Sequence, residues 1–192
     1  ATGTFNYTVS TTNGNGCANQ SASGTLTVTI PMPPGAGTKT WTCSSQTWSG
    51  PVRVADCDHN AFTNDDTAPH CRSYTYNSIK YFYYNWTYLD QNKNILCPSP
   101  WHVPTNSEFS TLISCLGSSG ANGKYYPESS TWGGALAGNA NGSSMHNDGS
   151  HGYYWSSMDF NADGAYCMDV STSTASTNGS NKYAGLQVRC IL

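Results

Sequence analysis

The chain has 192 residues, eight of them cysteine, while only 10% of its residues are charged and its formal net charge is −3. A chain of this length makes about one to two domains and buries roughly 70% of its unfolded surface, so it does not need disulfides merely to fold. Its lysines and arginines are scattered singly, which excludes a basic stripe for nucleic acid. No apolar run approaches the ~18–20 residues of a membrane span, and the sequence at Ala1 does not resemble a signal peptide. We therefore expect a mature chain or an excised fragment.

The cysteines indicate the compartment. Their number is even, no Cys-x-x-Cys pair occurs, and no closely spaced Cys/His quartet is present, so disulfides are expected rather than zinc or redox chemistry. Polarity comes from Ser, Thr, Asn and Gly, and 12% of the residues are aromatic. Uncharged hydrogen-bonding groups beside flat apolar rings are typical of an extracellular binding surface. We therefore expect a secreted, extracellular protein.

Residues 1–30 predict a β-hairpin. Phe5, Tyr7 and Val9 alternate with polar residues, the apolar residues at 26, 28 and 30 do the same, and a Gly/Asn/Ser-rich turn region separates the two runs. A lone two-stranded unit is marginal in water, so the hairpin must pack on the rest of the chain, a preceding domain or a neighbouring molecule. The Pro/Gly-rich residues 31–38 predict a linker, and residues 39–192 then form the second domain.

A helix is predicted from residue 105 to 116. Thr105 and Glu108 form a capping box, apolar residues follow on one face, and Gly117 is placed to end the helix. A weaker helix is expected within residues 86–93, and strands at 152–157, 165–170 and 184–192. The fold class is therefore α+β and loop-rich. Residues 117–152 are too long for a simple connection, and loops of this length usually carry function.

Five motifs follow one another along the second domain: Trp48-Ser49-Gly50-Pro51-Val52-Arg53-Val54 with Cys57; Cys71-Arg72; Cys97-Pro98-Ser99-Pro100-Trp101-His102-Val103-Pro104-Thr105 with Glu108-Phe109; Gly152-Tyr153-Tyr154-Trp155-Ser156-Ser157; and Gly185-Leu186-Gln187-Val188-Arg189-Cys190. In this order they resemble the FISUMP domain, a paralogous surface-protein domain of Fibrobacter and Bacteroidetes. The resemblance implies a compact α+β domain on a bacterial surface, in fimbrial or adhesin-like proteins.

Two looser resemblances accompany it. The Trp-His-Val-Pro-Thr, Tyr-Trp-Ser-Ser and Val-Arg-Cys elements are similar to formylglycine-generating-enzyme-like and C-type-lectin-like folds, and residues 1–30 resemble the last two strands of an adhesin Ig-like repeat. The formylglycine-generating enzymes use a closely spaced free cysteine pair that binds copper. Cys167 and Cys190 are too far apart in sequence for that pair, so the activity is not expected here.

The resemblance also guides the disulfide prediction. Cys97 and Cys190 fall in its two strongest motifs, and a bridge closing so long a loop removes the most chain entropy. The predicted bridges are Cys97–Cys190, Cys57–Cys71, Cys115–Cys167 and Cys17–Cys43.

One segment has the pattern of a calcium loop. Asp159, Asn161 and Asp163 precede Gly164 in a D-x-N-x-D-G arrangement that places hard oxygens around one point. The twelfth position is Val170 rather than a bidentate Glu, and the segment joins two predicted strands. A hairpin turn uses the same residues and is favoured, so calcium is the one candidate cofactor and none is expected. The two histidines within residues 146–151 lack further zinc ligands and favour a polar turn.

Candidate ligand-binding residues gather in the long predicted loop, namely Trp132, Tyr125, Tyr126, Asn147, Asp148 and His151. Rings stack on the C–H faces of a sugar, while amides and carboxylates fix its hydroxyls. Trp132 is followed by two glycines and is expected to be the exposed ring. Separately, Asp66-Thr67-Ala68 resembles a short O-glycosylation motif of Bacteroidetes, which would make Thr67 an exposed glycan site; the alternative is a plain turn.

No catalytic arrangement is apparent, because a G-x-S-x-G motif and recognisable carboxylate pairs are both absent. The sequence therefore predicts a non-enzymatic extracellular module of a bacterial surface adhesin, binding a carbohydrate or glycoprotein through residues 117–151. The alternative is a structural subunit of a filament or fimbria, in which residues 1–30 complete the sheet of the next copy by strand addition.

Overall fold

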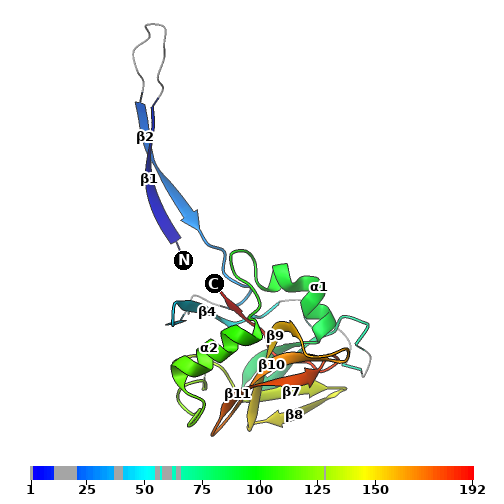
Figure 1. The fold of residues 1–192 in the computed structure, drawn as a ribbon. Coiled ribbons are helices and arrows are strands. Elements are labelled where there is room, and N and C mark those ends of the chain that lie inside the picture. The colour runs from blue at the N-terminus through cyan, green and yellow to red at the C-terminus, as the bar shows by residue number, and fades with distance from the viewer. Residues whose placement is uncertain are drawn as a thin grey trace. The chain divides into compact units, whose positions relative to one another are not determined.

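The computed structural model describes residues 2–10, 21–36, 41–54, 57, 62–63, 66–127 and 129–192. It divides the chain into two units, Ala1–Pro31 and Met32–Leu192. The first unit holds two antiparallel strands, β1 (Thr2–Ser10) and β2 (Ser21–Thr29), which confirms the predicted hairpin (Figure 1). The second unit mixes strands with helices, which confirms the α+β class. No helix in the described part of the chain is long and apolar enough to cross a membrane.

A five-stranded sheet in the order β11-β10-β9-β7-β8 forms the centre of the second unit. Its strands are β7 (Ala137–Asn141), β8 (Ser144–Asp148), β9 (His151–Asp159), β10 (Gly164–Ser171) and β11 (Ala175–Asn181). Neighbours are antiparallel except β7 and β9, which are parallel. β9 and β10 match two predicted strands, whereas β7 and β8 lie in the stretch predicted as a loop.

Two smaller sheets complete the unit. One contains β3 (Trp41–Cys43), β4 (Gln46–Pro51) and β12 (Arg189–Ile191), and the other pairs β5 (Cys71–Tyr76) with β6 (Ile79–Tyr84). The strand predicted over residues 184–192 is therefore shorter than expected. Before β12 the chain forms only isolated bridges, from Gly185 to Ala140, from Leu186 to Tyr84 and from Gln187 to Tyr154, because it crosses from one sheet to the next.

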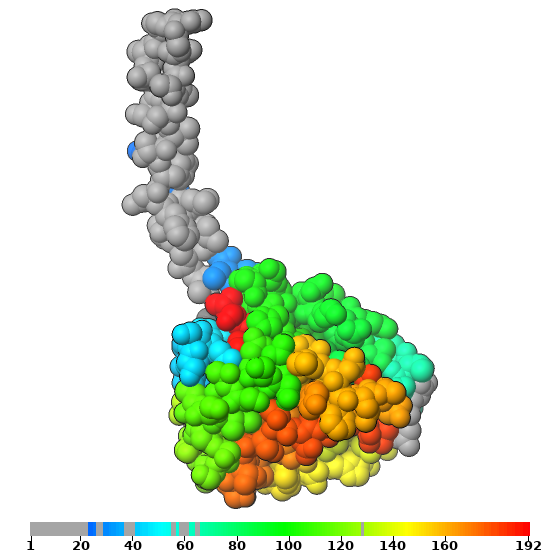
Figure 2. All heavy atoms as spheres, in the orientation of Figure 1, coloured from blue at the N-terminus to red at the C-terminus, as the bar shows by residue number. Residues whose placement is uncertain are grey.

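Both predicted helices form. α1 (Trp86–Leu96) begins at Asn85, whose side-chain oxygen accepts the Tyr88 N–H at 2.9 Å. α2 (Asn106–Leu116) begins with the predicted capping box: the Thr105 hydroxyl accepts the Glu108 N–H at 3.2 Å, and the Glu108 carboxylate accepts the Thr105 N–H at 2.7 Å. Residues of α2, in green, adjoin those of β9 and β10, in orange, on the surface in Figure 2.

The main core lies between α2 and one face of the five-stranded sheet. Phe109 of α2 packs with Met168 and Val170 of β10 in this core. Trp48 stacks on Phe109 with 5.5 Å between ring centroids, and it meets Trp132 edge to face at 6.0 Å. Because side chains alternate along a strand, Cys167 and Asp169, the alternate positions of β10, belong to the opposite face of the sheet.

Three disulfides join the described residues of the second unit. Cys97–Cys190 and Cys57–Cys71 are the predicted pairs and are confirmed. The third is Cys43–Cys115, with its Cα atoms 6.4 Å apart. The predictions Cys115–Cys167 and Cys17–Cys43 are therefore wrong. The turn from β3 to β4 lies beside α2, because the side-chain amide of Gln46, the first residue of β4, donates to the Glu108 carbonyl. Cys43 therefore meets Cys115. Cys167 is a buried free thiol. Cys17 lies outside the described residues.

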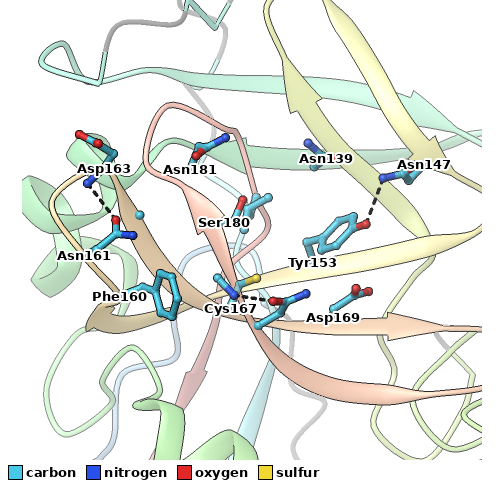
Figure 3. A pocket seen from close by; sticks show the side chains of 14 residues that line it. Asn139, Asn147, Tyr153, Phe160, Asn161, Asp163, Cys167, Asp169, Ser180 and Asn181 are labelled. Carbon is cyan, nitrogen blue, oxygen red and sulfur yellow. Dashed lines mark hydrogen bonds between the residues drawn. The ribbon is translucent and has the colours of Figure 1, made fainter.

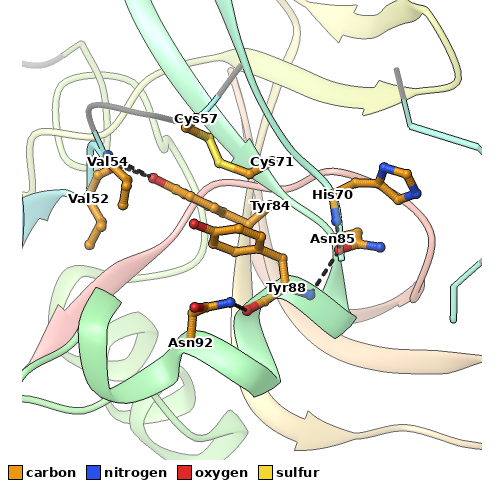
Figure 4. The surroundings of a disulfide bond; sticks show 9 residues. All are labelled: Val52, Val54, Cys57, His70, Cys71, Tyr84, Asn85, Tyr88 and Asn92. Atoms are coloured by element: carbon orange, nitrogen blue, oxygen red, sulfur yellow. Dashed lines mark hydrogen bonds between the residues drawn. A yellow bond between two sulfur atoms is a disulfide. The ribbon is translucent and has the colours of Figure 1, made fainter. Parts of the chain in front are cut away.

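The Cys57–Cys71 bridge lies beside a buried tyrosine. Figure 4 shows it next to Tyr84, whose hydroxyl donates to the Val52 carbonyl at 3.2 Å. The residues next to Tyr84 and Cys71 in the sequence are joined as well, because the Asn85 side chain accepts the His70 N–H at 2.8 Å. The bridge therefore joins the start of β5 to a segment that the end of β6 already holds in place.

Candidate ligand-binding site

Two of the predicted ligand-binding rings are core residues. Trp132 and Tyr125 are both 0% exposed, so the expectation that Trp132 is the exposed ring is wrong. The glycines that suggested an open loop have another role. A Cβ at Gly134 would lie 2.7 Å from the Tyr154 hydroxyl and 2.8 Å from the Trp132 ring. Glycine is required there for close packing, and the packed chain leaves Trp132 no access to solvent.

A polar pocket of about 510 Å³ lies on the face of the five-stranded sheet opposite the core (Figure 3). Its lining comes from all five strands, the β9–β10 turn and the segment after β11: Asn139, Asn147, Tyr153, Phe160, Asn161, Asp163, Gly164, Cys167, Asp169, Asn178, Gly179, Ser180, Asn181 and Leu186. We call it the sheet-face pocket.

Strand register explains why these residues meet. Cys167 of β10 lies opposite Asn178 of β11, and Asp169 lies opposite Tyr153 of β9. Residues directly opposite each other in an antiparallel pair project to the same face. The polar positions of three adjacent strands therefore form one surface, while their alternate positions, such as Met168, belong to the core.

The ring of Tyr153 is held in a defined orientation. Its hydroxyl accepts a hydrogen bond from the Asn147 side chain at 3.0 Å. His151 stacks on the ring with an interplanar angle of 5° and 5.6 Å between centroids. His151 in turn contacts Asp169 through Nδ1 at 2.7 Å. Burial, with the charge of Asp169, raises the pKa of Tyr153 above its ordinary value, so the hydroxyl keeps its proton.

The second aromatic ring is exposed at the other end of β9. Phe160 is 53% exposed and meets Tyr166 edge to face at 5.2 Å. An exposed phenyl ring on the rim of a polar pocket offers a flat apolar surface to a bound molecule.

The predicted binding residues are divided between several places. Asn147 lines the sheet-face pocket, and His151 contributes through Tyr153 and Asp169. Asp148 is exposed next to Asn147 but does not line the pocket. Tyr126 lines a separate pocket of about 640 Å³, together with Tyr76, Tyr81 and other residues. Residues 117–151 therefore do not form one binding face.

The calcium-like segment is the turn between β9 and β10. The Asn161 side chain accepts the Asp163 N–H at 3.0 Å, and Asp159 pairs with Lys182 at 2.8 Å. Among the described residues no group of three or more His, Cys, Asp or Glu side chains could hold a metal ion. These are the contacts of a hairpin turn, although Asn161 and Asp163 also line the sheet-face pocket.

Several lining residues were not predicted from sequence, among them Phe160, Asn178, Ser180 and Asn181. β11 reads Ala-Ser-Thr-Asn-Gly-Ser-Asn and has no apolar alternation, so nothing in it signals a strand. Thr67 is exposed, as an attached glycan would require, and its glycosylation stays a prediction.

The fold and its disulfides define a cystine-bridged α+β domain of the extracellular kind. Residues 37–192 match the family model of the Fibrobacter succinogenes major domain, and the chain belongs to this family. This confirms the resemblance to the FISUMP domain. No curated protein and no solved structure gives a match. Family membership and disulfides together indicate an extracellular surface protein.

Proposed function

We propose that the chain is a non-enzymatic binding module of a bacterial surface adhesin, and that its sheet-face pocket holds a carbohydrate, free or on a glycoprotein. The lining of the pocket carries this proposal. Side-chain amides, carboxylates and hydroxyls surround two aromatic rings, Tyr153 and Phe160. A sugar presents hydroxyls at its edges and C–H groups on its faces, so it needs both kinds of partner, and a few placed polar groups fix its orientation.

Preorganisation supports the same conclusion. Tyr153 is already fixed by Asn147 and by the stacked His151. A ring held in its binding orientation loses little conformational entropy when a ligand arrives, which matters for ligands that bury little apolar surface.

A glycan array probed with the full chain, followed by titration calorimetry on the saccharides bound, tests the proposal. Phe160→Ala and Tyr153→Ala are each expected to weaken binding at least tenfold. Phe160 is 53% exposed, so its substitution should lower the thermal midpoint only slightly, through loss of the edge-to-face contact with Tyr166.

Tyr126→Ala is the matched control, since Tyr126 is an aromatic ring of the other pocket. Loss of binding in Tyr126→Ala with retention in Phe160→Ala and Tyr153→Ala would move the site to that pocket. An array without bound saccharides would reject the function.

The N-terminal unit favours a second candidate function, the structural subunit of a filament. β1 and β2 contain no charged residue and no proline, the features that usually prevent the edges of a sheet from pairing. Their register places Phe5 opposite Leu26 and Val9 opposite Ala22. Among the described residues no further strand joins this sheet. Such a ribbon suits addition to a second copy.

Mass photometry and electron microscopy over a range of concentrations test the second candidate. Filaments or oligomers are expected to revert to monomers when Thr4→Lys and Thr8→Lys are combined, because lysines on an edge strand oppose pairing. Ser107→Lys, an exposed position on α2, controls for added charge. A uniform 20.6 kDa species at every concentration would reject self-assembly.

A further inference from the structure

The charged side chains that line the sheet-face pocket are all acidic. They are Asp163, in the β9–β10 turn, and Asp169, on β10, and the described lining includes no Lys, Arg or His. Figure 3 shows the two carboxylates at opposite ends of the pocket, with asparagines between them. A ligand spanning the pocket therefore approaches one carboxylate or the other wherever it carries its charge.

Neighbouring cations do not cancel these charges. Lys182 pairs with Asp159 at 2.8 Å and donates to the Ala162 carbonyl at 3.1 Å, so the charge of Asp159 already balances it. His151 contacts Asp169, and in its neutral form it donates Nδ1–H while leaving the carboxylate negative. Asp148, exposed beside the lining residue Asn147, adds a further negative charge.

We propose that the sheet-face pocket selects uncharged saccharides and rejects acidic ones, with Asp163 and Asp169 as the residues that set this selectivity; the inference rests on the proposed carbohydrate site. An ionised carboxylate accepts hydrogen bonds from sugar hydroxyls and so favours a neutral ligand. It repels the carboxylate or sulfate of an acidic sugar, and a charge repulsion of this kind acts against the wrong ligand without weakening the right one.

The test uses matched saccharides: tetrasaccharides of glucose, galactose and mannose, and their uronic-acid counterparts with the same linkages. Titration calorimetry is performed at about pH 8, above the range in which histidines ordinarily titrate, and in about 50 mM salt. Each neutral saccharide that binds is expected to bind at least tenfold more tightly than its acidic counterpart. Added salt should reduce the ratio of the neutral to the acidic saccharide's affinity, because it screens charges at the surface.

The double variant Asp163→Asn with Asp169→Asn should reduce this ratio to within about threefold, because the amides keep an acceptor and lose the charge. Asp90→Asn removes an exposed acid from α1, outside the pocket, and should leave the ratio unchanged. Equal binding of an acidic saccharide and its neutral counterpart would overturn this inference and leave the proposed function standing. Binding of no saccharide on the full glycan array would overturn both.

Discussion

Arg189 lies over the ring of Trp132, with its guanidinium carbon 4.0 Å from the ring centroid, and its Nη1 donates to the Trp132 carbonyl oxygen at 2.7 Å. Its other nitrogens donate to the Ser49 carbonyl. Arg189 is 2% exposed. One buried guanidinium thus joins β12, β4 and the segment that carries Trp132. It also covers the Trp132 ring, which was predicted from the sequence to be exposed.

Arg189→Lys is expected to lower the free energy of unfolding by about 2–3 kcal/mol, because an ammonium group cannot bond both carbonyls or stack on Trp132 in the geometry of the guanidinium fork. Urea denaturation followed by tryptophan fluorescence measures it. Arg72→Lys, at a partly exposed site where the guanidinium carbon lies 4.8 Å from the Tyr74 ring centroid, should lower stability by no more than about 1 kcal/mol, because it loses a ring contact but no buried hydrogen bonds to two carbonyls. Equal losses of stability in the two variants would show that the hydrogen bonds and ring contact of Arg189 do not stabilise the fold more than those of a surface arginine.

The disulfide Cys43–Cys115 closes a loop with a sequence separation of 72, and Cys57–Cys71 one of 14. In the loop-closure model these bridges contribute about 4 and about 3 kcal/mol. Replacing both cysteines of a bridge by serine should therefore lower the free energy of unfolding more for Cys43–Cys115 than for Cys57–Cys71. Denaturant titration of the two double variants compares them, and peptide mapping without reduction checks the pairing. A Cys115–Cys167 peptide would contradict the structure.

Cys167 should not react in the folded chain. Burial, reinforced by the charge of Asp169, raises the pKa of its thiol to about 12, and the thiolate is the reactive form. Iodoacetamide at about pH 8 is therefore expected to label Cys167 only after urea is added. Peptide mapping measures the labelling of Cys167 separately from that of Cys17. The labelling rate of reduced glutathione in the same solution serves as the reference for a freely reactive thiol. Labelling of native Cys167 at the rate of the unfolded chain would contradict its burial.

Glu108 makes the stability of α2 depend on pH. Burial alone would raise the pKa of Glu108, but hydrogen bonds from Thr105 and His102 hold it below its ordinary value of 4.5. A depressed carboxylate pKa stabilises the fold above the unfolded pKa, and this contribution is lost as the pH falls through the folded pKa.

Glu108→Gln, which keeps the capping box, should therefore cost about 0.5 kcal/mol near neutral pH. The difference from the parent chain should shrink as the pH falls below about 4.5. Thermal unfolding at several pH values measures it, and Asp90→Asn should give a smaller, flatter difference, since its Lys93 pair is exposed. A difference that grows on acidification would have the wrong sign.

Local rules predicted local structure in this chain. The α2 capping box needs only Thr105 and Glu108, three residues apart, and it forms as expected. The pairing of Cys43 with Cys115 depends instead on where β3 meets α2, and no local pattern records that meeting. The prediction that Trp132 is exposed was wrong for a related reason. Glycines beside a ring occur both in open loops and in tight packing, and only the spatial neighbours of Gly134 distinguish the two.

The candidate site shows the same limit. Asn147 was identified because it lies in a polar segment, but Asn178 comes from a strand without an apolar pattern. The two line one pocket only through the order of strands in the sheet, which the sequence of any single strand does not contain.

The division of β10 into Met168 and Val170 on one side and Cys167 and Asp169 on the other separates two kinds of constraint. Substitutions at Met168, Val170 and the equally buried Cys167 alter how well the domain folds, whereas substitutions at Asp169, which contacts His151 at the pocket, would under the proposed function alter which ligand the domain accepts. Under the proposed function, the same backbone acquires new ligand preferences through changes at exposed lining residues such as Phe160 and Asp163, while the buried positions of β10 stay fixed.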